Sequence, residues 1–178
     1  MALRVVFWLV FALAMAVYVV MVAWSLPTVS AAAGGLAPFD LRPGGYTFEE
    51  AREFLRALSP AGKAHYLYVQ HPLDYVYPPL ITATLYLGIA LLTPDAAGRW
   101  RWVIGVVALP IVAFDYLENL AVARLLQLGA DRATPTAVAT ASRWTLLKSG
   151  FSTVAMTLLL ALLIAWVVRS LRAKRSAG

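Results

Sequence analysis

The chain has 178 residues, of which 61% are hydrophobic and 13% are charged, and its formal net charge is +6. A soluble domain of this length cannot bury so much apolar surface, so the composition indicates an integral membrane protein. The absence of cysteine excludes disulfide scaffolds, thiolate nucleophiles, cysteine-bound metals and dithiol redox chemistry.

Four apolar runs are each long enough to cross a membrane, because one helical crossing takes about 20 residues. We expect transmembrane helices at about residues 5–26, 74–93, 101–126 and 145–169, all within a single membrane domain covering residues 1–178. The predicted fold class is therefore all-α, a polytopic membrane protein with four transmembrane helices in a bundle. The third run is the weakest, since it contains Asp115, Glu118 and Asn119, which need shielding by neighbouring helices.

The first run has two interpretations. Ser30-Ala31-Ala32-Ala33 resembles the small-residue cleavage site of a signal peptide. The apolar run is longer than the roughly 7–15 residues typical of such a signal, so we favour an uncleaved first helix. The intact mass of the protein distinguishes the two.

Residues 27–73 are polar enough to leave the lipid and are predicted to form an extracytoplasmic loop containing short amphipathic helices. Thr47-Phe48-Glu49-Glu50 fits a capping box at the start of one such helix, whose apolar residues recur at helical spacing. The loop is either an interfacial lid that ties down helix ends or a lid over a site that admits lipid from the outer leaflet.

A second short helix is predicted just before the second membrane helix. Ser59-Pro60 fits an N-cap followed by proline at the first helical position. We expect His71-Pro72 to end this short helix and Asp74 to cap the membrane helix that follows. Pro78-Pro79 is then tolerated because it lies near the first turn of that helix.

Basic residues predict how the chain is oriented. Four of them follow the last apolar run: Arg169, Arg172, Lys174 and Arg175. By the positive-inside rule the C-terminus is cytoplasmic, and an even number of crossings places the N-terminus there too. We expect a multi-pass protein of the bacterial cytoplasmic (inner) membrane whose partners are membrane lipids, with anionic headgroups at the C-terminus, and not nucleic acid.

Ionisable residues are predicted to share one layer of the bundle, in its outer half. Asp115, Glu118 and Asn119 stand at i, i+3 and i+4, so they project from one face of the third helix. Counting about 1.5 Å per residue from the flanking tryptophans places Glu118 and Lys148 both about 24 Å from the cytoplasmic side. Candidate binding residues near this layer are Tyr18, His71, Asp74, Tyr77 and Asn119.

Three interpretations of this cluster are open. Ion pairs between Lys148 and Asp115 or Glu118 could simply fix the register of the helices. Alternatively, two acids facing one lysine leave a surplus carboxylate, which suits Asp115 and Glu118 as catalytic acid–base groups with Lys148 as their electrostatic partner. A metal site built from these acids with Asp74, His65 and His71 has no ligand spacing to support it, and we expect neither metal nor cofactor.

These features favour a small integral membrane protein whose buried polar site binds or processes a lipid-like substrate; the sequence leaves open whether it is an enzyme. The alternative is a non-catalytic accessory or assembly subunit of a membrane complex, in which the charged cluster is structural and a protein partner or a second copy docks elsewhere. A small transporter is disfavoured because no internal repeat is evident among the predicted helices.

The plan of four membrane helices with acidic residues near the outer face resembles that of the lipoprotein signal peptidases, whose two aspartates activate a water. The Asn- and Gly-bearing aspartate motifs of that family are absent here, and Asn119 is the only asparagine in the chain. Sterol isomerases of the four-helix type also use buried acids, and their motifs are not matched either. The resemblance is thus one of general plan.

Overall fold

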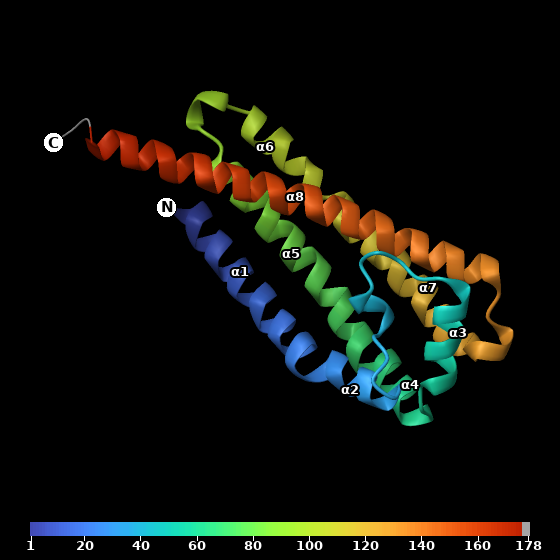
Figure 1. The fold of residues 1–178 in the computed structure, drawn as a ribbon. Coiled ribbons are helices and arrows are strands. Elements are labelled where there is room, and N and C mark those ends of the chain that lie inside the picture. Colours follow the sequence, from blue (N-terminus) through green and yellow to red (C-terminus); the bar gives the residue numbers. More distant parts are fainter. Residues whose placement is uncertain (176–178) are drawn as a thin grey trace.

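The computed structural model describes residues 1–175, apart from the side chain of Arg175, and it contains helices, turns and loops but no strand in that part (Figure 1). The predicted membrane domain includes residues 176–178, and the predicted basic cluster includes Arg175. Those three residues and the Arg175 side chain lie outside the described part of the chain. Four helical stretches are long and apolar enough to cross a membrane: Ala2–Ala32, Pro60–Leu92, Trp100–Arg132 and Pro135–Lys174. The all-helical class and the four candidate crossings are therefore confirmed.

Three of the four stretches are built from more than one helix. The first comprises α1 (Ala2–Val20), a π-helical turn (Met21–Ser25) and α2 (Leu26–Ala32). The second comprises α4 (Pro60–His65), a π-helical turn (Tyr66–Gln70) and α5 (His71–Leu92). The third comprises α6 (Trp100–Gly105), a 3₁₀ turn (Val106–Ala108) and α7 (Pro110–Arg132), and the fourth is α8 (Pro135–Arg175). The connections contain α3 (Phe48–Ala57) and 3₁₀ turns at Phe39–Leu41 and Asp95–Ala97.

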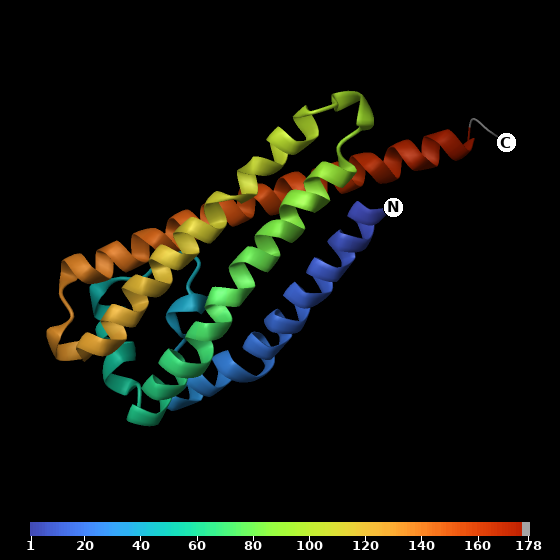
Figure 2. The same ribbon diagram turned by 180° about the vertical axis from the view of Figure 1, so that it is seen from behind.

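Helix α5 lies in the middle of the molecule and packs against α1, α7 and α8, while α7 and α8 also pack against each other. Both described ends of the chain and the connection between α5 and α6 lie at one end of the molecule (Figures 1 and 2). Helices α3 and α4 and the turn between α7 and α8 lie at the opposite end. This arrangement agrees with an even number of crossings.

Two helix ends predicted from prolines are wrong. The sequence predicts that the loop begins at Pro27 and that His71-Pro72 ends a short helix, whereas the helix continues through both sites. In each case a π-helical turn ends two residues before the proline, at Ser25 and at Gln70. A π turn shifts the backbone hydrogen-bond ladder, so the missing proline N–H falls where the ladder is already interrupted. The first two helical stretches are consequently joined by residues 33–59, and the predicted loop 27–73 overlaps the end of the first stretch and the start of the second.

The last two stretches are longer than their apolar runs. The third continues to Arg132 and not to about residue 126, with a kink at Gly129, where φ is +70°. Helix α8 begins at Pro135 and not at about residue 145, because Thr134 Oγ1 accepts a hydrogen bond from the Ala137 N–H (3.2 Å) and proline occupies the first helical position. Hydropathy alone does not detect these polar turns.

Both predicted helix caps in the connection are confirmed. The Thr47 N–H donates to Glu50 Oε2 (2.7 Å) and the Glu50 N–H donates to Thr47 Oγ1 (3.2 Å), which completes the capping box of α3. The hydrogen bond from the Thr47 backbone lowers the pKa of the Glu50 carboxyl from its ordinary value. At the start of α4, Ser59 Oγ accepts from the Gly62 N–H (3.1 Å).

The connection packs around a cluster of aromatic rings, three from the connection itself and one from Tyr66. The Phe39 ring lies 4.7 Å from the Tyr46 ring and 4.9 Å from the Phe54 ring, and Phe54 lies 6.2 Å from Tyr66, all measured between ring centroids. All four residues are buried, and residues of α7 and α8 complete the cluster. The 3₁₀ turn that contains Asp40 is thereby fixed against the helices.

Gly45 is required where this connection meets α8. Its φ is +77°, and an added Cβ would lie 2.7 Å from Ser142 Oγ, which accepts a hydrogen bond from the Tyr46 N–H (2.9 Å). We expect Gly45→Ala to lower the free energy of unfolding by roughly 1–2 kcal/mol from the backbone conformation alone. Gly44→Ala is the matched control, since nothing lies within 4 Å of its added Cβ. Thermal unfolding in detergent compares the two variants, and equal losses would contradict the prediction.

Candidate functional site

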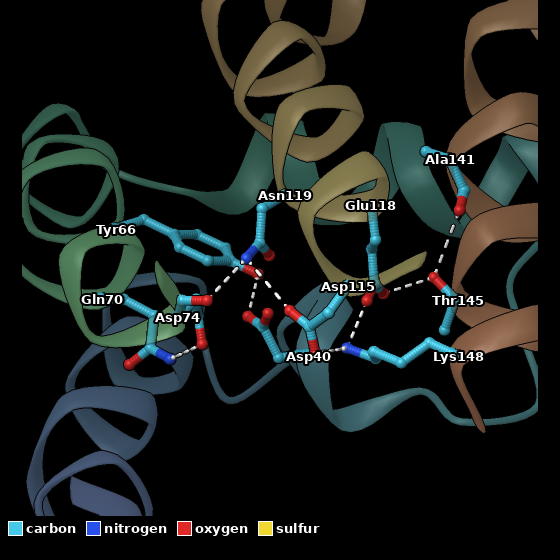
Figure 3. Close-up of polar contacts among 10 residues, drawn as sticks. All are labelled: Asp40, Tyr66, Gln70, Asp74, Asp115, Glu118, Asn119, Ala141, Thr145 and Lys148. Atoms are coloured by element: carbon cyan, nitrogen blue, oxygen red, sulfur yellow. Dashed lines mark hydrogen bonds and ion pairs between the residues drawn. The ribbon is translucent and has the colours of Figure 1, made fainter. Parts of the chain in front are cut away.

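An ion-pair cluster joins α7 to α8 (Figure 3). Asp115 and Glu118 stand one turn apart on α7, and Lys148 of α8 reaches both: its Nζ lies 3.5 Å from Asp115 Oδ2 and contacts the Glu118 carboxylate. Thr145, one turn before Lys148, donates its hydroxyl to Glu118 Oε1 at 2.5 Å. Glu118 is fully buried, whereas Asp115 and Lys148 each keep some exposed side-chain surface. The structure thus brings together the three residues that the sequence places at one level.

Prolines leave two backbone carbonyls of α5 without their helical donors, and side chains of α7 donate hydrogen bonds to both. Pro78-Pro79 lies inside α5 and not in its first turn, so the carbonyls of Asp74 and Tyr75, four residues earlier, lose their helical donors. Asn119 Nδ2 donates to the Asp74 carbonyl (2.9 Å), and the Tyr116 hydroxyl donates to the Tyr75 carbonyl (2.9 Å). The prolines are tolerated because of this tertiary contact, and the two helices are held in a fixed register.

Asn119 and His71 complete the link between α5 and α7. Asn119 Nδ2 also donates to Asp115 Oδ1 (3.1 Å), and His71 Nε2 lies 2.8 Å from the Asn119 carbonyl oxygen. Both residues are buried. Asn119 thus connects Asp115 to the backbone of α5, while His71 Nδ1 is buried without a hydrogen-bond partner.

Asp74 is buried inside a helix and is not the cap that the sequence predicts. Its Oδ1 accepts a hydrogen bond from Gln70 Nε2 (2.9 Å), one turn earlier. Its Oδ2 is buried without a hydrogen-bond partner, and 5% of the residue surface is exposed. A buried carboxylate oxygen in this state is unusual and marks the site as one that a donor could complete.

Sequence reasoning misses Asp40, which lies in the 3₁₀ turn Phe39–Leu41. The Tyr66 hydroxyl donates to Asp40 Oδ2, and the carboxylate interacts electrostatically with Asp74 and Asp115. Asp40 stands in an irregular segment without hydrophobic periodicity, so no local pattern marks it. Only the burial of the adjacent Phe39 brings it to this site.

A pocket of about 260 Å³ lies beside the ion-pair cluster. It is lined by residues of the first helical stretch, of α5, α7 and α8, and of the turn containing Asp40. Its polar lining consists of Tyr18, Asp40, Asp74, Tyr77, Asp115, Lys148 and Ser152. Its apolar lining consists of Met21, Val22, Leu26, Leu41, Ile81, Leu85, Ile111 and Met156.

The candidate residues thus divide into two groups. Five of them line the pocket: Tyr18, Asp74, Tyr77, Asp115 and Lys148. The other three, His71, Glu118 and Asn119, do not line it and are held in contacts between helices. The division separates residues that can touch a ligand from residues that position them.

The two histidines make contacts that do not converge on one point. His65 Nε2 lies 3.1 Å from Ser25 Oγ of the first π-helical turn, whereas His71 faces Asn119. Within the described residues, no group of three or more His, Asp or Glu side chains is arranged to hold a metal ion.

Comparison of the chain with known protein families, with curated proteins and with solved structures gave no match. Function must therefore be inferred from the shape, the charges and the surroundings of the pocket.

Proposed function

We propose that the protein is a four-helix membrane bundle whose pocket, in the outer half of the bundle, binds a lipid-like amphiphile. The observation that carries this proposal is the composition of the pocket, which combines ionisable groups with an apolar lining. A polar head group fits the first part and a hydrocarbon chain fits the second. A packed ion pair that served only to fix helix register would not need the adjoining 260 Å³ of space.

Access from the lipid is supported by the rim of the pocket. Tyr18 and Val22 on the α1 side are 45% and 42% exposed, and Met156 on the α8 side is 48% exposed. Helix α1 packs chiefly on α5, so the rim between α1 and α8 is free to face acyl chains. A bilayer-dissolved ligand could enter there without crossing water.

The distribution of charge supports the proposed orientation. At the end of the molecule with both termini, Arg4, Arg101 and Arg169 line one pocket, as expected of a cytoplasmic side. The opposite end carries the connection 33–59, which has charged residues of both signs and would then be extracytoplasmic. The pocket lies toward this second end because Asp40 and Leu41 of the connection line it.

If the protein processes its ligand, the pocket assigns the acid–base groups differently from the sequence. Asp115 and Asp74 line the pocket and can reach a bound molecule, whereas Glu118 is enclosed by Lys148 and Thr145. We therefore propose Asp115 and Asp74 as the reacting carboxylates, Lys148 as the group that stabilises their charge, and Glu118 as a positioning residue.

A tryptophan at the rim tests the proposal. We expect native mass spectrometry of wild-type protein released from membranes to detect a retained lipid, and we expect Met156→Trp to fill the pocket and to abolish it. Val154→Trp is the matched control, since Val154 lies on the same helix, is 54% exposed and does not line the pocket. Equal lipid occupancy in all three proteins would overturn the proposal, and a stoichiometric protein partner in its place would favour an accessory subunit.

A further inference from the structure

The charges around the pocket are unbalanced. Three carboxylates line it, those of Asp40, Asp74 and Asp115, against a single cation, Lys148. That cation is already engaged by Asp115 and by the buried Glu118. Among the residues that the structure describes, no other basic side chain lines the pocket. A phosphate or carboxylate head group would therefore meet three acids and no available cation, which disfavours anionic ligands.

The hydrogen-bonding groups show the same imbalance. Asp40, Asp74 and Asp115 line the same pocket, and Figure 3 draws Asp40 between the other two. Asp74 Oδ2 is buried without a donor, because Gln70 supplies only the hydrogen bond to Oδ1. The hydroxyls of Tyr18, Tyr77 and Ser152 also line the pocket, but none of them satisfies Asp74 Oδ2. A protonated primary amine, which carries three donors and no acceptor, could supply the missing donor. Charge and hydrogen bonding thus call for the same group.

Two tyrosines add a further feature that suits a cation. The rings of Tyr18 and Tyr77 line the pocket with their centroids 5.8 Å apart. The face of an aromatic ring attracts an ammonium group within about 6 Å of its centroid, most strongly where water is excluded. Together with the carboxylates, the rings form a site that is both acidic and aromatic.

A second, mainly apolar groove lies farther along α1, α5 and α8, toward the end of the molecule with both termini. It has a volume of about 430 Å³, and its lining includes Arg4, Phe7 and Phe11 of α1, Leu91 and Leu92 of α5, and Leu159 and Leu163 of α8. Leu159 lies about one helical turn beyond Met156, so the groove comes next after the pocket along α8. From Lys148 to Leu163 the distance along α8 is about 22 Å, which suits an extended hydrocarbon chain.

We infer that the ligand is a long-chain amine: its ammonium group lies among Asp40, Asp74 and Asp115 beside the two tyrosine rings, and its hydrocarbon chain lies in the apolar groove. This inference rests on the proposed function, since it names the class of amphiphile that the same pocket binds. It distinguishes the pocket from one that holds an ordinary anionic membrane lipid.

Three probes with one hydrocarbon chain test the inference: a primary alkylamine, the alcohol and the carboxylate of the same length. Binding is measured by native mass spectrometry on protein in phosphatidylcholine nanodiscs, where the bilayer carries no net charge. We expect the amine to bind roughly tenfold to a hundredfold more tightly than the alcohol, as charge-assisted hydrogen bonds require, and the carboxylate to bind most weakly.

Variants show whether the carboxylates cause the preference. Asp74→Asn should remove most of the advantage of the amine and leave alcohol binding unchanged. Asp40→Asn in the connection should independently weaken amine binding, and it serves as the test should Asp74→Asn fold poorly. Asp95→Asn is the control, because Asp95 pairs with Arg101 at the opposite end of the molecule and its side chain is 96% exposed. It removes one negative charge without touching the pocket.

The outcomes separate the two proposals. If the alcohol or the carboxylate binds wild-type protein as tightly as the amine, the inference about the head group is wrong and the proposed function stands. If none of the three probes binds wild-type protein better than Met156→Trp, the proposed function fails together with the inference.

Discussion

Lys148→Met is expected to lower the free energy of unfolding by about 3–5 kcal/mol, because it leaves buried acids without their cation. Glu118 is fully buried, and its contacts are with Lys148 and the Thr145 hydroxyl. Removing the lysine leaves a carboxylate that neither water nor lipid can solvate. The free energy is measured by equilibrium unfolding of the detergent-solubilised protein with increasing SDS. Lys174→Met is the control, because Lys174 is an exposed lysine of the same helix.

A second substitution distinguishes lost charge pairing from lost packing. Combining Lys148→Met with Glu118→Gln removes the fully buried unpaired charge, while the amide can still accept the hydrogen bond from Thr145. Asp115 alone then lacks its cation, and its side chain keeps some exposed surface. We expect this double variant to regain most of the stability that the single variant loses. A double variant as unstable as Lys148→Met alone would show that the lysine side chain acts through its packing.

The number of candidate membrane crossings and the residues of the ion-pair cluster could be predicted because both depend on local spacing. Apolar runs of sufficient length indicate crossings whatever the tertiary structure. Asp115 and Glu118 share a helix face by their i, i+3 spacing, and depth along a neighbouring helix places Lys148 at the same level. The capping box at Thr47 is equally local, and it is confirmed.

The course of the helices around their prolines could not be predicted in this way. Pro78-Pro79 is tolerated because Asn119 and Tyr116 donate to the two carbonyls that the prolines leave free. Those donors lie about forty residues away in the sequence and meet α5 only in the folded protein. Local rules that treat proline as a helix end therefore overestimate the length of the loop.

Asp40 could not be predicted for a related reason. Its position over the pocket depends on the ring cluster of Phe39, Tyr46, Phe54 and Tyr66, which combines two separate segments of the chain. A capping box and short helices are visible in the sequence, but the packing that turns them into a cover for the pocket is not. The cluster therefore links the stability of the connection to the proposed site.

Phe54→Ala is expected to lower the free energy of unfolding by about 3–5 kcal/mol, the usual range for removing a buried aromatic ring. Phe54 has no exposed surface and lies between the rings of Phe39 and Tyr66. Its loss leaves a cavity next to both neighbours. Because Tyr66 holds the Asp40 carboxylate and Phe39 precedes it in the chain, we also expect Asp40 to lose its fixed position.

Hydrogen exchange locates this effect, since amides of residues 39–58 should lose protection while those of α8 keep it. Phe48→Ala, which removes a half-buried ring from the same helix, is the matched control and should cost less than half as much. Weakened binding of a long-chain amine by Phe54→Ala, at a temperature where the helices remain folded, would show that the aromatic core maintains the acidic end of the pocket. Unchanged amine binding, with the connection unprotected, would show that Asp40 does not contribute and that Asp74 and Asp115 alone form the head-group site.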